Sequence, residues 1–251
     1  MGRIHATVDV GGLRPGARSA ETRSKMIQVA IEVFAELGYE AASTRILADR
    51  AGVNLAAIPY HFGGKRELYV AAALQIADYA RGRIDPVVSR LRDPSRADLS
   101  TRIKEAFSSY FHLVVGGPEP ESWISFFVRC ERDADDAFHL IHDEAVTRFE
   151  RALTQSIAEA RGCDADDESL KIRVSMLLAS IFSIRTLRNV TLNSLGWDRL
   201  NPERIQKLET IITEFSLREL LAIPVGAHDD KQQPKPKTSQ RSRPKAVYSK
   251  R

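Results

Sequence analysis

The sequence of 251 residues is 43% hydrophobic, which is enough to bury a sizeable core in one or two domains. It has no run of about 18 consecutive apolar residues, and its first residues lack the apolar stretch of a secretory signal, so we expect a cytoplasmic protein with no membrane partner. The net charge of +4 comes from residues 224–251, where eight Lys or Arg and two Asp give +6; residues 1–223 total −2, so the overall basicity is no evidence for nucleic-acid binding.

The side chains that usually carry catalysis or bind metals form no recognisable pattern. Cys130 and Cys163 are too few and too far apart for a disulfide framework or a zinc site, which predicts reduced thiols and leaves a redox switch as the alternative. Asp136, His139 and His142 are only a faint match to metal ligands on one helix face. The sequence has no Glu-x-x-His pair, nucleophile elbow or Gly-rich phosphate loop. We therefore predict that the protein is not an enzyme and holds no metal or cofactor.

The N-terminal segment divides into an arm and a helix. Residues 1–20 contain four Gly, one Pro and three Arg without apolar periodicity, which predicts a disordered arm. An arm that enters the DNA minor groove is the alternative. From Thr22, apolar residues recur at spacings of three and four up to Leu37, and Gly38 is expected to end this helix.

Two short helical patterns follow, on either side of an Ala-Gly-Val-Asn sequence. Ser43 is a natural N-cap for a helix over residues 44–51. Gly52 can end that helix in the left-handed conformation, and Val53 can fill the gap between the two helices. Asn54 can cap a second helix that starts at Leu55. This arrangement predicts a helix-turn-helix.

The second helix is short because Pro59 has no N–H for the helical hydrogen bond. Tyr60 and His61 can donate hydrogen bonds to phosphate oxygens, whereas Phe62 is better interpreted as a core residue that seats the motif. Lys65 opens the next helix, where the amides and the positive dipole end favour an anion.

The ordered set Phe34-x-x-x-Gly38-Tyr39, Ala51-Gly52-Val53, Tyr60-His61-Phe62 and Lys65 resembles the TetR family of bacterial repressors. The resemblance covers residues 22 to about 74, and Pro59 departs from it because the family usually has Tyr there. It implies a double-stranded operator DNA as partner. The residues that it and the motif assign to DNA binding are Ser43, Thr44, Arg45, Asn54, Leu55, Ala56, Ala57, Tyr60, His61 and Lys65.

The rest of the chain also indicates helices, so the predicted fold class is all-α. A helix from Lys65 to Asp85 should link two domains, with Pro86 kinking or ending it. Helices are expected over 103–115, around 123–130, and over 138–160, 170–195 and 202–223. We predict an N-terminal three-helix DNA-binding domain over 21–70, a helical regulatory and dimerisation domain over 71–223, and a disordered basic tail over 224–251.

The last two predicted helices carry more apolar surface than one face of a helix can bury. This surface comprises Ile172, Leu177, Ile181, Ile184, Leu187, Leu208, Ile211, Ile212, Phe215 and Leu220. The resemblance implies that these two helices form a four-helix interface in a homodimer. The segments ending in Leu195-Gly196-Trp197 and Asn201-Pro202-Glu203 also resemble, more weakly, the regulatory domain of CerR-type members of the family.

Aromatic residues in the second domain could line an apolar pocket for a small-molecule effector, or could equally be core. The candidate ligand-binding residues are Phe107, Tyr110, Phe111, Trp123, Phe126 and Phe127, with Arg129 and Arg185 to meet an anionic or carbonyl group. The predicted function is a homodimeric, ligand-responsive transcriptional regulator, most often a repressor in this family. The alternatives are a helical ligand-binding protein or enzyme, and an architectural DNA binder without an effector.

Overall fold

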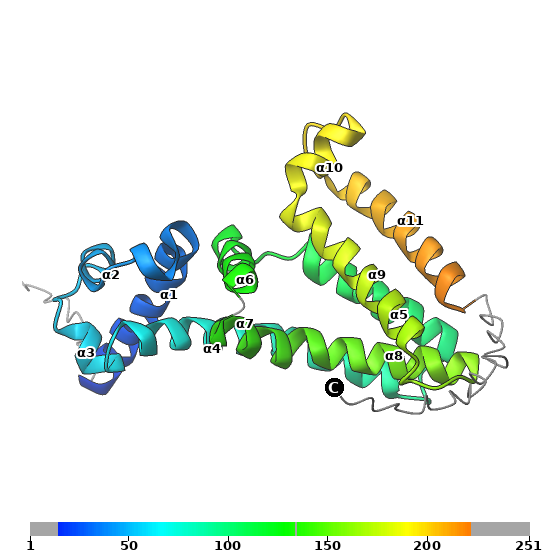
Figure 1. The fold of residues 1–251 in the computed structure, drawn as a ribbon, viewed down its shortest axis with the longest axis horizontal. Coiled ribbons are helices and arrows are strands. Elements are labelled where there is room, and N and C mark those ends of the chain that lie inside the picture. Colours follow the sequence, from blue (N-terminus) through cyan, green and yellow to red (C-terminus); the bar gives the residue numbers. More distant parts are fainter. Residues whose placement is uncertain (1–14, 134, 222–251) are drawn as a thin grey trace, which may run out of the picture.

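The computed structural model describes residues 15–133 and 135–221, without the side chains of 15–18 and Glu219, and within these ranges every regular element is helical. Figure 1 shows an elongated molecule with the N-terminal helices at one end. The elements are α1 (Pro15–Ala41), α2 (Thr44–Ala51), α3 (Ala57–Phe62), α4 (Lys65–Arg92), α5 (Leu99–Val115), α6 (Glu121–Asp133), α7 (Asp136–Ile141), the π-helical turn η1 (His142–Val146), α8 (Thr147–Arg161), α9 (Glu168–Thr186), α10 (Arg188–Leu195) and α11 (Pro202–Leu221).

The predicted helix-turn-helix is confirmed, and the capping residues act as expected. The Ser43 hydroxyl accepts a hydrogen bond from the Ile46 amide at 3.2 Å. Gly52 ends α2 at φ 63°, a left-handed conformation that costs glycine little. Asn54 Oδ1 accepts from the Ala56 amide at 2.9 Å, which holds Leu55 and Ala56 in a turn. The second helix therefore starts at Ala57 and not at Leu55.

The predicted arm is too long, because α1 begins at Pro15 and residues 15–20 are helical. Proline suits the first position of a helix, where its missing N–H would have had no partner. At the other end, Gly38 breaks the helical geometry with φ 80° and ψ 169°. The rest of the predicted arm, 1–14, and the predicted tail, 224–251, lie outside the described residues.

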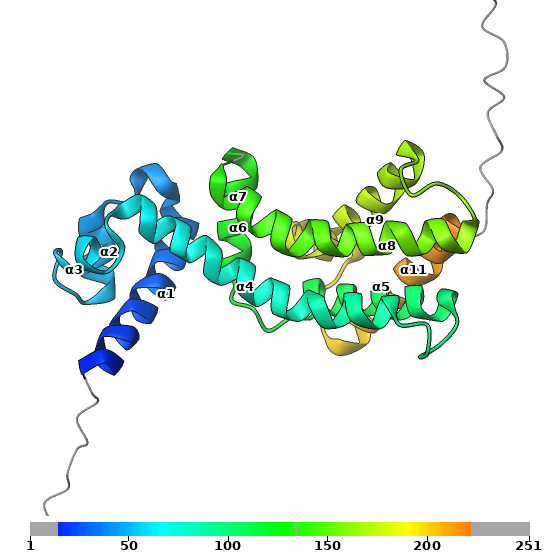
Figure 2. The ribbon, with the colours of Figure 1, turned by 90° about the horizontal axis from the view of Figure 1, so that it is seen from below.

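Helix α4 continues through Pro86 to Arg92, so Pro86 does not end the helix and the predicted boundary at Asp85 is wrong. A proline ring crowds the carbonyl four residues earlier. Here that carbonyl belongs to Gly82, and the helix nevertheless continues past the proline. Buried side chains on both sides of Pro86, those of Ile84, Val87 and Leu91, hold the helix to the core. Helix α4 runs along the molecule beside α8 (Figure 2).

Two other long helices of the prediction are interrupted. The helix predicted over 138–160 contains the π-helical turn η1 between α7 and α8. The helix predicted over 170–195 breaks at Leu187, whose φ of −107° and ψ of 35° are not helical, so α9 and α10 point in different directions (Figure 1). No helix among the described residues is both long and apolar enough to cross a bilayer.

The buried apolar residues form two cores, and α6 contributes to the first. That core joins α1, α2, α3 and the first half of α4 to Phe126 and Cys130 of α6 and Ile141 of α7. Phe126 packs on Tyr69 with ring centroids 5.2 Å apart. The second core lies between the second half of α4 and helices α5, α8, α9 and α11. Helices α6 and α7 therefore attach the second predicted domain to the first.

Candidate functional site

The residues predicted to bind DNA are mostly uncharged, with Arg45 and Lys65 as the exceptions. Tyr60 is 82% exposed and meets the His61 ring edge-on at 4.9 Å between centroids. Ser43, Leu55 and Ala56 are exposed. Half-buried residues of the predicted set are Thr44, Ala57, His61 and Lys65. This surface can offer hydroxyl, imidazole and methyl groups to a nucleic acid, but few charges.

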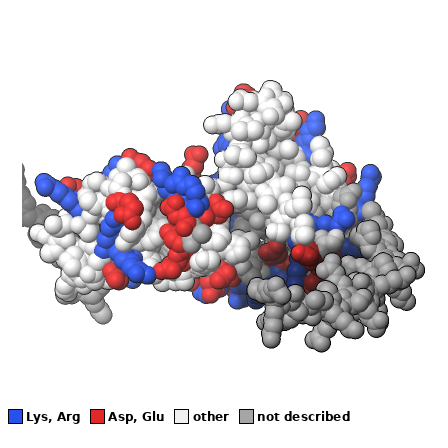
Figure 3. All heavy atoms as spheres, viewed as in Figure 1, with Lys and Arg blue, Asp and Glu red and all other residues white. Residues whose placement is uncertain are grey.

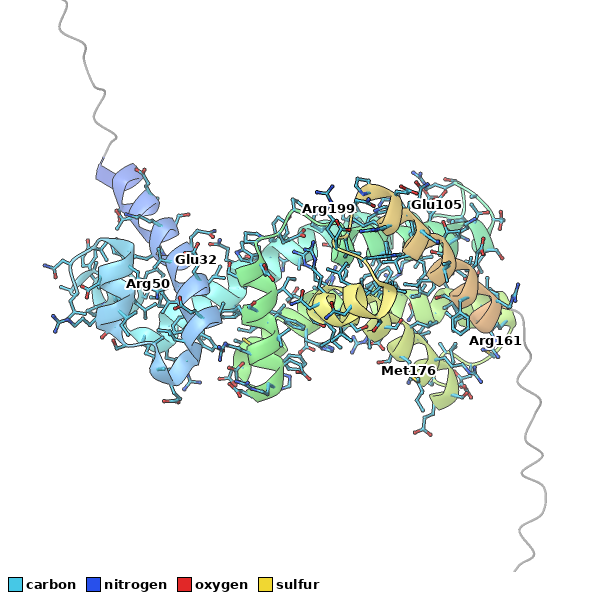
Figure 4. All side chains as sticks on the ribbon, turned by 90° about the horizontal axis from the view of Figure 1, so that it is seen from above. Glu32, Arg50, Glu105, Arg161, Met176 and Arg199 are labelled. Carbon is cyan, nitrogen blue, oxygen red and sulfur yellow. The ribbon has the colours of Figure 1, made fainter. Side chains whose placement is uncertain are left out.

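Two arginines of α2 have different partners. Arg45 is highly exposed and only 3.9 Å from Asp49, an exposed pair that contributes little to stability. Arg50 forms a two-pronged bond to Glu36 of α1, with nitrogen–oxygen distances of 2.5 and 3.1 Å. That bond lowers the pKa of the Glu36 carboxyl. Arg50, labelled in Figure 4, thus fastens α2 to α1, and Arg45 is left available to a ligand.

Lys65 lies at the start of α4 and contacts the end of α1. Its Nζ is 4.2 Å from the centroid of the Tyr39 ring and 3.4 Å from the Glu40 carbonyl oxygen, to which it donates. Phe62 packs against the first core, as predicted, with the Arg23 guanidinium 5.0 Å above its ring. Lys65 therefore joins α4 to the helix-turn-helix as well as offering a charge.

An apolar cavity of about 130 Å³ lies between the two cores. Three of the predicted ligand-binding residues, Tyr110, Trp123 and Phe127, line it. The other lining residues come from α4, α5, α6, α7, η1, α9 and the loop after α5: Ile76, Tyr79, Ala80, Arg83, Ile84, Leu113, Val114, Glu119, Ile124, Ile141, Ala145, Val146 and Phe182. We refer to this space as the aromatic cavity.

Phe107, Phe111 and Phe126 do not line the aromatic cavity, contrary to the prediction. Each is only 1% exposed, and the first two belong to the second core and Phe126 to the first. Adjacent helical residues point about 100° apart, so Phe126 faces α1 while Phe127 faces the cavity. The Phe127 ring meets Phe182 of α9 edge-on at 5.5 Å.

Three residues of the cavity wall that the sequence did not predict, Tyr79, Arg83 and Glu119, form a hydrogen-bonded polar cluster. The Tyr79 hydroxyl donates to a Glu119 carboxylate oxygen at 3.0 Å, and the Arg83 guanidinium donates to the same oxygen at 3.2 Å. Tyr79 also meets the Trp123 ring edge-on at 5.1 Å. Tyr79 and Arg83 are four apart on one helix, a spacing that could have been noticed, but Glu119 lies in a loop without periodicity.

The predicted arginines Arg129 and Arg185 line a second space instead, a polar cavity of about 630 Å³. Arg185 donates to the carbonyl oxygens of Val114, Gly117 and Glu119 and so stabilises the carboxyl end of α5. The lining residues are Ala35, Val115, Gly116, Gly117, Glu119, Glu121, Ile124, Ser125, Val128, Arg129, Arg132, Arg185, Thr186, Arg188, Leu200 and Ile205. We refer to this space as the arginine cavity.

Helix α6 joins these cavities to the N-terminal helices. Arg129 donates hydrogen bonds to the carbonyl oxygens of Ala35 at 2.6 Å and Glu36 at 2.7 Å. Beyond the end of α6, Asp135 accepts from the Tyr69 hydroxyl at 2.6 Å. A displacement of α6 would therefore disturb these hydrogen bonds to α1 and to the start of α4.

Several apolar side chains of α9, α10, α11 and the break between α9 and α10 are exposed in a single chain: Ile172, Met176, Leu187, Val190, Leu195, Ile211 and Phe215. Met176 projects outward from α9 in Figure 4, and the α10 region is nearly free of charge in the view of Figure 3. Ile181, Ile184 and Leu220 are buried in the chain's own second core, so they are not part of the predicted dimer surface.

The candidate redox and metal residues are not gathered into a site. Cys130 is buried and Cys163 is exposed, and both thiols are free. His142 Nδ1 lies 3.1 Å from the Thr147 hydroxyl and 3.5 Å from an Asp143 carboxylate oxygen. Across the described ranges, no three His, Cys, Asp or Glu side chains are grouped to hold a metal ion.

Two family models match this chain, one on each half. The model for bacterial regulatory proteins of the tetR family matches residues 26–72, and the model for the C-terminal domain of the HTH-type transcriptional dual regulator CecR matches residues 99–223. The chain belongs to the TetR family of transcriptional regulators. The second match confirms the weaker resemblance of the second domain to a regulatory domain of this family, under the name CecR and not CerR.

Among curated TetR-family relatives, the dual regulator CecR of Shigella flexneri is 28% identical over 78% of this chain and 90% of its own. The transcriptional activator FasR of Mycolicibacterium smegmatis is 34% identical over 41% of this chain and 46% of its own. A transcriptional regulator from Rhodococcus sp. Rha1 shares the fold, with a TM-score of 0.54 at 20% identity over 80% of this chain and 99% of its own. FadR of Bacillus subtilis, solved with stearoyl-CoA, has a TM-score of 0.53 at 16% identity over 77% of this chain and 97% of its own.

Proposed function

We propose that this protein is a homodimeric repressor that binds an operator through the helix-turn-helix and releases it when a small molecule enters the aromatic cavity. The observation that carries the proposal is the position of α6. Trp123 and Phe127 of this helix line the cavity, whereas Phe126 and Arg129 contact α1. An occupant that displaces α6 would therefore displace α1 as well.

Helix α4 supports the same coupling by a second route. Ile76, Tyr79, Ala80 and Arg83 line the cavity, and Lys65 at the start of the same helix contacts Tyr39. Lys65 and Arg83 are separated by roughly 27 Å of helix at 1.5 Å per residue. A small rotation of this rigid helix would change the separation of two DNA-binding units in a dimer, so that both could not contact their half-sites together.

Selection of DNA fragments from the protein's own genome tests the DNA-binding part. We expect enrichment of a palindromic sequence whose half-sites lie about 10 base pairs apart or a multiple of this, on one face of the duplex. Recovery of fragments with no common sequence would indicate an architectural DNA binder and would contradict the proposal. Deletion of the gene should raise transcription beside the enriched sites; a fall would contradict repression.

The ligand-responsive part has its own test, because coupling between two sites is reciprocal. A compound that weakens operator binding by a given factor must itself bind more weakly, by the same factor, when the operator is saturating. Complete switching requires about 5.5 kcal/mol of differential binding, which two cavities in a dimer can share. An effector whose affinity is unchanged by saturating operator would contradict this mechanism.

A further inference from the structure

The charges around the arginine cavity do not balance. Four arginines line it, Arg129, Arg132, Arg185 and Arg188, against only two acidic residues, Glu119 and Glu121. The cavity lies beside the loop after α5 and is bordered by α6 and by the end of α9. Its lining residue Ala35 belongs to α1, so the cavity also reaches the N-terminal helices.

Glu119 does not neutralise these arginines, because its carboxylate is already bonded to Tyr79 and Arg83 in the aromatic cavity. Glu121 lies at the exposed start of α6. Within the described residues Arg188 has no ion pair, and Arg132 has only an exposed one, 3.6 Å from Asp133. The arginine cavity therefore has an excess of positive charge that an anion would compensate.

The two cavities share part of their walls. Glu119 and Ile124 line both of them. Gly117 is required for this arrangement, since a Cβ there would lie 1.8 Å from a Glu119 carboxylate oxygen and 2.4 Å from the Leu113 carbonyl oxygen. The two spaces therefore adjoin at Glu119 and Ile124, and one ligand could extend past Ile124 from one into the other.

We propose that the effector is an amphiphilic organic anion, with an apolar group in the aromatic cavity and a carboxylate, sulfonate or phosphate in the arginine cavity. This inference rests on the proposed function and names the chemical class of its ligand. The aromatic cavity, at about 130 Å³, is close to the roughly 150 Å³ apolar cavity known to hold benzene, so its occupant is about one ring in size.

Arg132 and Arg188 are the residues that bind the head group, because their guanidinium groups are the least engaged with the protein. Guanidinium binds carboxylate and phosphate with two parallel hydrogen bonds. Arg129 and Arg185 contribute positive charge while bonded to main-chain carbonyls. A cationic effector is disfavoured because the carboxylate of the aromatic cavity, Glu119, is already paired with Arg83.

The test uses ω-phenyl carboxylates, from phenylacetate to 6-phenylhexanoate, and the alcohol that matches each acid in length. Binding is followed by the fluorescence of Trp123 in the full chain carrying Trp197→Phe, since the sequence has only these two tryptophans. We expect at least one acid to bind about tenfold more tightly than its alcohol, because a guanidinium binds a carboxylate through two charge-assisted hydrogen bonds, which are stronger than its bond to a neutral hydroxyl. Arg132→Gln with Arg188→Gln should remove this preference and leave alcohol binding unchanged.

Arg151→Gln is the matched control, because Arg151 is an exposed arginine of α8 outside both cavities. It should keep the preference for acids. Equal binding of acids and alcohols, or a preference that survives in the double variant, would overturn the head-group assignment without affecting the proposed repressor function. Absence of binding by both series would overturn the inference and the effector cavity together, while operator selection would still test DNA binding separately.

Discussion

The guanidinium of Arg129 in α6 donates a 2.6 Å hydrogen bond to the carbonyl oxygen of Ala35 in α1. The same side chain donates to the next carbonyl, that of Glu36, at 2.7 Å. Ala35 and Glu36 lie just before Gly38, where α1 leaves helical geometry, so their carbonyls have fewer partners within the helix. These hydrogen bonds join α6, which lines both cavities, to α1 of the DNA-binding domain, in addition to the apolar contacts of the first core.

Arg129→Gln should separate effector binding from operator release. The shorter side chain loses both bonds, and we expect a loss of about 1–3 kcal/mol in the free energy of unfolding, measured in urea. Operator affinity should stay within a few-fold, but its response to a bound phenyl carboxylate should shrink. A variant that keeps the full response would contradict the role assigned to this contact, and Arg151→Gln provides the control.

Stability should fall at alkaline pH because of the contact between the half-buried Tyr69 hydroxyl and the buried Cys130 thiol. Burial, with the hydrogen bond to Asp135 second, raises the pKa of Tyr69 well above its ordinary value, and burial raises the pKa of the Cys130 thiol to about 12. Relative to the unfolded chain, the folded protein therefore favours the protonated Tyr69 hydroxyl and the protonated Cys130 thiol. Their contribution is complete below the ordinary thiol pKa of about 8.5 and is lost as the pH rises towards the folded-state values.

Urea midpoints between about pH 8 and 10.5 measure this loss. Cys130→Ala should make the decline shallower, while Cys163→Ala should follow the wild type because that thiol is exposed. A thiol reagent should also label Cys163 and spare Cys130 in the native protein. Equal labelling rates for the two thiols would show that this account of Cys130 is mistaken.

Ala80→Leu should fill the aromatic cavity and block its ligand. Ala80 lines the cavity from α4, and leucine is a good helix former, so we expect unchanged or slightly higher stability. Binding of the phenyl alcohols should weaken by about tenfold or more, because burying three extra carbon atoms removes the space for the ring. Ala160→Leu, on the exposed side of α8, should bind as the wild type does, and the same result for Ala80→Leu would argue against the cavity as the ligand site.

Lys65→Ala should weaken binding to all DNA sequences about equally. The loss should be uniform because a phosphate contact carries no sequence information. Because one fewer phosphate is neutralised, the slope of log affinity against log salt should become shallower by about one unit. Loss of the contact with Tyr39 should also cost about 0.5–1 kcal/mol of stability. Arg151→Ala should leave the salt slope unchanged. A loss confined to one operator base would instead assign Lys65 to base recognition.

Charged residues on the exposed apolar face of α9 and α11 should dissociate the dimer. Phe215 is 60% exposed and Ile172 is 51% exposed in a single chain, so glutamate at both positions should leave the monomer folded. In an apolar dimer interface the same two carboxylates would be buried without partners, which is costly. Light scattering should then give a monomer mass. A dimer that persists would contradict the proposed interface. Ile181 is unsuitable for this test, because at 1% exposure its substitution would disrupt the second core.

The sequence by itself determined the helix-turn-helix and the helical class. The capping contacts of Ser43, Gly52 and Asn54 involve backbone groups only a few residues away, so they can be predicted from a short stretch of sequence. The apolar periodicity of the long helices is local in the same sense. It indicates that a helix has a buried face, but it does not say which other helix covers that face.

The tertiary structure alone decided which side chains line each cavity. Phe126 and Phe127 are neighbours of the same type, yet one packs against Tyr69 in the first core and the other against Phe182 at the aromatic cavity. Glu119 joins the cavity wall because a loop brings it to Arg83, 36 residues away in the chain. Contacts of this kind depend on how whole helices pack together, and packing is set by the sum of many distant contacts, which no short stretch of sequence contains.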